Sequence, residues 1–166
     1  LPISYSLIES RLGFFAIILN FVIINANIPS GSMENTIMTN DKLIALRTSY
    51  WFNDPKRGDI IIFKYPDDET EWFIKRVIAL PGETVLVKDG KVYINGSKKA
   101  LSEPYIKEEP VEDFGPYKVP KNGYFVMGDN RNNSNDAREW ETHYVSRDEV
   151  LGKAWFRYYP SIKVIK

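Results

Sequence analysis

The stretch EWFIKRVIALPGETVLVKDGKVYING, Glu71 to Gly96, contains the pattern that decides the fold. Branched and aromatic residues fill both halves, Pro81-Gly82 separates them, and Asp89-Gly90 divides the second half into two short runs. Branched and aromatic residues favour strands, and an Asp-Gly pair between alternating apolar residues is a strong hairpin signal. The stretch therefore predicts one strand followed by a β-hairpin.

Further runs of the same kind, bounded by Gly, Pro and Asp, occupy residues 41–47, 58–66, 123–130 and 153–159. No helical periodicity longer than a few turns follows the N-terminal segment. Residues 100–122 carry four prolines and many charges, so we expect an irregular, exposed loop within a smaller lobe. The sequence thus predicts a mainly β domain.

The composition excludes several function classes. Lys plus Arg (22) balances Asp plus Glu (22) without a basic patch, so we expect no nucleic-acid partner. Cysteine is absent and His143 is the single histidine, so a thiol nucleophile and a clustered His/Cys zinc site are both excluded. We expect neither a metal nor another cofactor. Hydrolytic chemistry would have to come from hydroxyls, carboxylates, a lysine or the one imidazole.

The N-terminal segment is apolar from Leu12 to Ile24, with Asn20 as its one polar residue. A spanning helix needs about 20 residues, and extending the segment to Ile3 and Ile28 brings it into that range. We expect residues 1–28 to hold one transmembrane helix that contacts the lipid bilayer, followed by a β domain at 29–166. A buried core helix is the alternative interpretation.

Lys75 lies in the predicted strand on the same face as Phe73, Val77 and Ala79, because side chains alternate along a strand. Burial among apolar neighbours disfavours the charged amine and lowers its pKa. A neutral lysine can accept the proton of a serine hydroxyl, which is a poor nucleophile without a base. The alternative is a lysine whose amine extends to solvent at the strand end.

The segment NANIPSGSMENTIM, residues 25–38, places Ser30 and Ser32 on either side of Gly31. Pro, Gly, Ser and Asn are typical of a turn, which is the simpler interpretation. If the segment is extended, both serines lie on one side and Gly31 lets a substrate come close. Ser32 could then attack while its own N–H and the Ser30 hydroxyl form an oxyanion hole.

A third polar segment, GDNRNNSNDAR, covers residues 128–138. On composition alone it is a polar loop. A calcium-binding loop is excluded because Arg131 stands where a ligand is required. A Ser-His-Asp triad of His143 with Asp129 or Asp136 stays open as an alternative.

Together these elements resemble the bacterial type I signal peptidases, membrane-anchored serine proteases with a Ser/Lys dyad. The resemblance covers nearly the whole chain through five segments in order: IPSGSMENTI, GDIIIFKYP with FIKRVIALPGE, VKDGKVYING, GDNRNNSNDAR and VLGKAWFRYYP. It implies an antiparallel β-sheet catalytic core, a smaller β lobe inserted at about residues 82–122, and one N-terminal transmembrane helix. The shortness of the chain and the segment AREWETHYVSRDEVLGKAWFRYYP, residues 137–160, look more like Gram-positive members than the larger Gram-negative ones.

The resemblance also implies roles for individual residues. Ser32 would be the nucleophile, Lys75 the general base, Ser30 an oxyanion-hole donor and Ser134 the residue that orients the lysine. Arg76, Asp129, Asp136 and Arg138 would support the site by ion pairs. The shallow substrate pockets would be formed by Ile28, Pro29, Met33, Phe73 and Ile74.

The implied function is removal of signal peptides from exported precursors by a membrane-bound endopeptidase whose catalytic domain lies outside the cytoplasm. The chain departs from the family at Asn35, where proline is usual, and at Ala137, where serine is usual. One alternative is a self-cleaving repressor-type Ser/Lys peptidase, although that class has a DNA-binding helix-turn-helix where this chain has an apolar segment. The other is a non-catalytic membrane-anchored β module that binds a partner.

Overall fold

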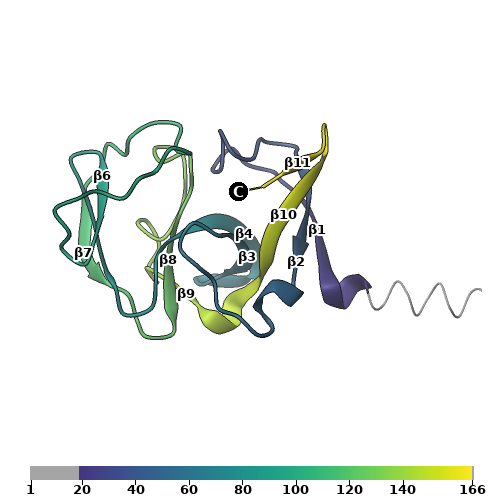
Figure 1. Ribbon diagram of the computed structural model, residues 1–166, viewed down its shortest axis with the longest axis horizontal. Coiled ribbons are helices and arrows are strands. Elements are labelled where there is room, and N and C mark those ends of the chain that lie inside the picture. The colour runs from purple at the N-terminus through teal and green to yellow at the C-terminus, as the bar shows by residue number, and fades with distance from the viewer. Residues whose placement is uncertain (1–18, 166) are drawn as a thin grey trace, which may run out of the picture.

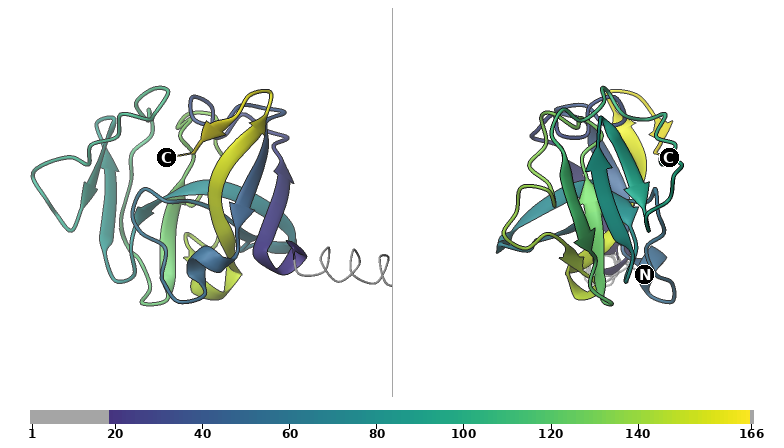
Figure 2. Two further views of the ribbon diagram at one scale, coloured as in Figure 1. Left: turned by 45° about the vertical axis from the view of Figure 1, so that its right-hand side comes forward. Right: turned by 90° about the vertical axis from the view of Figure 1, so that its left-hand side faces the viewer.

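The computed structural model describes residues 19–165, which form two antiparallel sheets (Figures 1 and 2). The main sheet has the strand order β1 (Ile23–Asn27), β2 (Lys42–Leu46), β10 (Val150–Tyr159), β3 (Ile60–Tyr65), β4 (Asp68–Ala79), β8 (Gly123–Met127) and β9 (Val145–Ser146), with β11 (Lys163–Val164) paired to β10. The small sheet has the order β6 (Lys91–Ile94), β5 (Thr84–Lys88) and β7 (Phe114–Lys118). Two 3-10 turns, η1 (Thr48–Tyr50) and η2 (Arg147–Glu149), and a helical segment at residues 19–22 complete the regular structure of this part of the chain. The prediction of a mainly β, antiparallel protein is confirmed.

The small sheet is formed by the excursion between β4 and β8, and Figure 1 shows it on the left of the main sheet. Its three strands fall within residues 82–122, the range expected for the smaller lobe. The predicted Asp89-Gly90 hairpin is present: both residues have positive φ, 49° and 75°, as the two central residues of a tight primed turn require. Register pairs Lys88 with Lys91 across that turn.

Two expectations for the strands are corrected. Residues 23–27 were assigned to the anchor, but they form β1 and pair with β2, and Ile28 is 3% exposed in the core. The apolar run up to Ile24 has no period of two. The alternation of Ile24, Ala26 and Ile28 with the exposed Asn25 and Asn27, which is typical of a strand, begins only where that run ends. Residues 100–122 are also not wholly irregular, because β7 pairs with β5.

Most of the predicted anchor lies outside the described residues. Residues 19–22 are helical and lead directly into β1. Within the range 19–165, no helix combines the length and the hydropathy that a membrane crossing demands.

The core has two parts, one on each face of the central strands. Along β3, Ile61 and Phe63 join one buried cluster, whereas Ile60 and Ile62 join the other. The first cluster continues into the small lobe through Val85, Val87 and Val92, and the second contains the residues around β1 and β2. Because both faces of β3 and β4 are covered, a polar side chain in the middle of β4 is removed from water.

Candidate active site

Ser32 lies in a tight turn after β1. The backbone N–H of Glu34 donates to the Gly31 carbonyl at 3.0 Å. Asn130 fixes the turn from the other side: its N–H donates to the Ser32 carbonyl at 3.1 Å and its Nδ2 to the Gly31 carbonyl at 3.0 Å. Ser32 is 7% exposed, so its hydroxyl is held in a defined and largely dry place.

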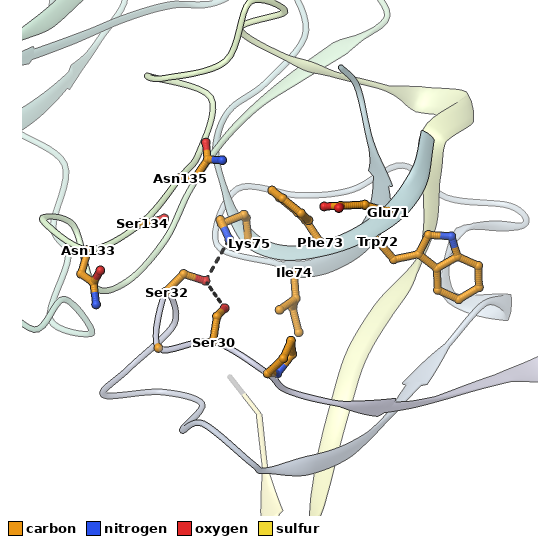
Figure 3. A pocket seen from close by; sticks show the side chains of 12 residues that line it. Ser30, Ser32, Glu71, Trp72, Phe73, Ile74, Lys75, Asn133, Ser134 and Asn135 are labelled. Atoms are coloured by element: carbon orange, nitrogen blue, oxygen red, sulfur yellow. Dashed lines mark hydrogen bonds between the residues drawn. The ribbon is translucent and has the colours of Figure 1, made fainter. Parts of the chain in front are cut away.

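Lys75 reaches Ser32 from the middle of β4. Its Nζ donates to Ser32 Oγ at 2.9 Å and lies 5.1 Å from the ring centre of Phe73 (Figure 3). The side chain is 4% exposed. Burial lowers the pKa of Lys75 to about 8, and the opposing attraction of the Asp136 carboxylate is the smaller effect. The strand thus delivers an amine that is substantially neutral near pH 8 to a serine hydroxyl.

Ser30 lies beside the same hydroxyl. Its Oγ is 3.5 Å from Ser32 Oγ, and both side chains line the pocket of Figure 3. The expected extended conformation is replaced by a bend and a turn, which nevertheless keep the two hydroxyls on one side. A donor in this position can contact an oxygen of a substrate carbonyl that Ser32 attacks.

Ser134 lies in the loop after β8 and lines the same pocket. Its Oγ is buried and has no hydrogen-bond partner among the described residues. Gly128 packs against Ser134: a Cβ at Gly128 would lie 2.2 Å from Ser134 Oγ and 2.4 Å from the Ser32 carbonyl oxygen. Only glycine permits so close an approach of the closing loop to the serine turn.

Two buried ion pairs connect the site to its support. Arg76 contacts Asp129 through Nε at 2.8 Å and Nη2 at 2.7 Å, and Arg138 contacts Asp136 through Nε at 2.9 Å. Asp129 also accepts a hydrogen bond from Thr36 in the serine turn at 2.5 Å. Asp136 accepts the Gly128 N–H at 2.9 Å. The structure therefore brings all four predicted support residues against the segments that contain Ser32 and Ser134.

A pocket of about 570 Å³ opens over the dyad. It is lined by Pro29, Ser30, Gly31, Ser32, Glu71, Trp72, Phe73, Ile74, Lys75, Asn133, Ser134 and Asn135. The predicted wall residues Pro29, Phe73 and Ile74 are among them. Ile28 and Met33 are not, which corrects their expected role. They are 3% and 0% exposed and pack with Ile74 in the second core cluster, so they support a wall residue from behind.

His143 is not part of this site. Its Nδ1 donates to the Ala137 carbonyl at 2.8 Å, and its ring packs edge-on against Phe114 and Tyr117 of β7. Because Asp129 and Asp136 are engaged by arginines, the alternative histidine triad is not formed. Within residues 19–165, no three His, Cys, Asp or Glu side chains gather in a way that could hold a metal ion.

The sequence did not indicate several residues of the site. Asn130 braces the serine turn, and Glu71, Trp72, Asn133 and Asn135 form part of the pocket wall. The alternation that placed Phe73 beside Lys75 could also have placed Glu71 there, since both are an even number of residues from Lys75. The asparagines give no comparable signal, because a polar loop has no period.

The two departures from the family pattern have clear local surroundings. Asn35 has φ 85°, a left-handed conformation that asparagine tolerates and that the proline ring cannot adopt. Ala137 is fully buried, with its N–H directed to the Val126 carbonyl at 3.3 Å and its carbonyl accepting from His143. The backbone conformation at residue 35 therefore suits asparagine, and the small side chain of Ala137 is enclosed in the core.

The chain is similar to known signal peptidases. The profile of the family "Signal peptidase, peptidase S26" matches residues 5–159. The chain is 46% identical over 142 residues to the probable signal peptidase I-2 of Synechocystis sp., covering 82% of this chain and 63% of that protein. It is 48% identical over 141 residues to signal peptidase I of Leptolyngbya laminosa, covering 80% and 67%.

The chain thus spans about two thirds of the length of these two relatives. A solved structure of a signal peptidase I from Enterococcus faecalis superposes with a TM-score of 0.53 at 36% identity, covering 61% of this chain and 97% of that one. The family match covers most of the chain and the fold agrees with it. The chain therefore belongs to the signal peptidase family, peptidase S26, a family of serine endopeptidases.

Proposed function

We propose that this protein removes N-terminal signal peptides from exported precursors, with Ser32 as nucleophile and Lys75 as general base. The observation that carries the proposal is the 2.9 Å contact between Lys75 Nζ and Ser32 Oγ at a lysine whose pKa is lowered to about 8 by burial. An amine that is held dry beside a hydroxyl is the arrangement that activates a serine without a histidine.

The reaction follows from the atoms in the pocket. Ser32 Oγ attacks the carbonyl carbon of the scissile bond while Lys75 Nζ takes the hydroxyl proton. The Ser30 hydroxyl and the Ser32 N–H donate to the developing oxyanion. When the carbon–nitrogen bond breaks, Lys75 returns the proton to the leaving amine. A water molecule, deprotonated by the same amine, then attacks the ester carbon. The bond from that carbon to Ser32 Oγ breaks, and the proton passes from Lys75 to Oγ, which restores the hydroxyl and releases the carboxylate.

Ser134 is proposed to orient the lysine, and the ion pairs of Arg76 with Asp129 and of Arg138 with Asp136 to hold the surrounding loops. The orphaned, buried Oγ of Ser134 supports this role, because a buried hydroxyl without a partner is costly unless it serves a group in the site. Reorientation of the Lys75 amine after proton transfer would give it such a partner.

The substrate preference follows from the pocket wall. Pro29, Phe73 and Ile74 offer neutral, apolar surface beside the dyad. Together with the family resemblance, this favours small residues immediately before the cut and two positions earlier. The protein is further proposed to act at the extracytoplasmic face of a membrane, anchored by the apolar N-terminal segment, where its precursors are still tethered.

The deciding experiment is cleavage of a purified precursor in detergent or lipid, with the cut site mapped by mass spectrometry. Wild-type protein should cut after a small residue, and Ser32→Ala and Lys75→Met should abolish cleavage while circular dichroism shows an intact fold. His143→Ala should retain most of the activity. Cuts after large or charged residues would contradict the substrate assignment, and full activity of Ser32→Ala would contradict the mechanism.

The membrane assignment has a separate test. Protease added to intact spheroplasts should digest the β domain, because that domain is proposed to lie outside the cytoplasm. Protection of the domain under these conditions would contradict the proposed topology and leave the chemistry to be judged by the cleavage assay.

A further inference from the structure

One segment of the small lobe contacts three segments of chain that support the site. Residues 103–111, between β6 and β7 and called the strap below, reach the serine turn, β4 and the loop that contains Ser134. None of the strap residues lines the pocket over the dyad. Its contacts are therefore with the segments around that pocket and not with the pocket itself.

The strongest contact of the strap is an ion pair between Glu103 and Arg131. The guanidinium Nη1 and Nη2 donate to the two carboxylate oxygens at 3.1 and 2.6 Å, and the two side chains are 6% and 0% exposed. A buried bidentate pair is geometrically specific, and removal of one partner leaves an uncompensated charge. Glu103 therefore fixes where Arg131 lies.

Arg131 carries this position to the reacting groups. Its Nε donates to the Gly128 carbonyl at 3.0 Å. The α-carbon of Gly128 has Ser134 Oγ and the Ser32 carbonyl oxygen packed against it, so closely that a Cβ would not fit. A displacement of Arg131 would thus be transmitted through Gly128 to both serines.

The strap also contacts β4 and the serine turn. Arg76 follows Lys75 in β4, and its guanidinium carbon lies 3.8 Å from the centre of the Tyr105 ring. The Tyr105 hydroxyl donates to Glu103 at 3.0 Å. Lys107 donates its N–H to the Asp129 carbonyl at 3.1 Å and pairs its amine with Glu34 of the serine turn at 3.2 Å. The serine turn, β4 and the loop after β8 therefore all contact the strap.

We propose that the strap is a positioning element for the dyad, with Glu103 as its principal positioning residue acting through Arg131 and Gly128. The inference rests on the proposed function. Because the geometry of nucleophile and base enters the rate directly, a displacement of about 1 Å costs roughly a hundredfold in turnover. The inserted lobe accordingly contributes to catalysis without touching the substrate.

The test compares Glu103→Gln, Glu103→Asp and a control in steady-state cleavage of one signal-peptide substrate by the full chain. Glu103→Gln keeps the shape and removes the charge, and we expect kcat to fall at least tenfold with KM changed less than twofold. Glu103→Asp restores the charge and should recover part of kcat. The control, Asp113→Asn, changes another carboxylate of the same lobe, which accepts the Asp89 N–H at 3.0 Å, and its kcat should equal that of wild type.

Rates are referred to the folded fraction measured by near-ultraviolet circular dichroism. If Glu103→Gln does not fold, Tyr105→Leu replaces it, because that change removes the ring from Arg76 without leaving a buried charge; the same fall in kcat at constant KM is expected. A folded variant with wild-type kcat, or one whose loss lies entirely in KM, overturns the strap proposal. Failure of the wild-type protein to cleave would instead overturn the proposed function.

Discussion

The amine of Lys75 lies between the ring of Phe73 and the hydroxyl of Ser32, in a side chain that is 4% exposed. Nothing about lysine itself makes it a base at neutral pH, because its ordinary pKa is about 10.4. The environment supplied by β4 lowers that pKa to about 8. Two measurable consequences follow, one for the rate and one for the stability.

The rate should rise with pH through the lowered pKa. Only neutral Lys75 can accept a proton, and with a pKa of about 8 the neutral fraction grows from about one tenth at pH 7 to about nine tenths at pH 9. We expect kcat/KM on a precursor peptide to increase by about tenfold over this range and then level off. Lys75→Arg should be inactive throughout, since guanidinium stays protonated. A flat profile between pH 7 and 9 would contradict this assignment.

Removal of the Lys75 amine should increase the stability of the fold, although it should abolish activity. Below pH 8 Lys75 is protonated in both the folded and the unfolded chain, and its charge is penalised only in the folded one. Lys75→Met should therefore raise the free energy of unfolding by about 3 kcal/mol at pH 7, because the pKa falls from 10.5 to about 8 and each pKa unit corresponds to about 1.4 kcal/mol. The gain should shrink by more than half at pH 10, where wild-type Lys75 is neutral when folded. Urea unfolding at both pH values measures it, with Ser32→Ala as the control that keeps the amine.

The turn that contains Ser32 is a short element with an unusual backbone. Asn35 lies in the left-handed region with φ 85°, while Thr36 and Ile37 donate back to the Met33 carbonyl at 3.1 and 2.9 Å. The neighbouring Thr36 hydroxyl contacts Asp129. Asn35, where the family usually has proline, therefore lies in a turn that is closed by backbone hydrogen bonds to the Met33 carbonyl.

Restoring the family residue here should be harmful. Proline requires φ near −65°, so Asn35→Pro forces the turn out of its conformation and should cost about 1–3 kcal/mol of stability together with activity. Asn35→Gly, which accepts φ 85°, should be close to wild type in both. Thermal unfolding and precursor cleavage of the two variants decide the point. A proline variant as stable and active as wild type would show that the turn can adopt another conformation.

Much of the element structure was accessible from sequence, for reasons that also explain the failures. β4 and the β5–β6 hairpin were predicted because alternation and Asp89-Gly90 are local signals. β1 was missed because it begins at the end of a continuous apolar run, so that the alternation of Ile24 and Ala26 with Asn25 and Asn27 covers only a few residues. β7 was missed because Pro116 and its charged surroundings are typical of a loop. The pairing of Glu103 with Arg131 joins residues far apart in the chain, so no local pattern contains it.

At the scale of the whole molecule, the two sheets share the first of the two buried clusters. Phe125 of β8 is fully buried and meets the rings of Phe114 and Tyr117 of β7 at 5.3 and 6.0 Å between centres. The first buried cluster runs without interruption from β3 and β4 into β5 and β6. The small lobe is therefore expected to unfold with the main sheet.

Phe125→Ala should destabilise both sheets at once. Removing a buried phenylalanine costs about 3–5 kcal/mol, because the cavity collapses only in part. In hydrogen exchange followed by mass spectrometry, peptides from β3 and from β5 should lose protection together. Val164→Ala, at an exposed position of β11, is the matched control and should change neither. Loss of protection confined to the small lobe would show two independent units.

The neck of the small lobe bears on how such a chain can vary over evolutionary time. Gly82 donates its N–H to the Val119 carbonyl at 3.1 Å, and Val119 donates to the Glu83 carbonyl at 2.8 Å, so the excursion leaves and re-enters the main sheet at one point. Outside the strap, the length of the excursion therefore does not set the distance between Lys75 and Gly128. A reporter peptide inserted into the exposed Gly96–Lys99 turn is expected to leave the nucleophile beside its base.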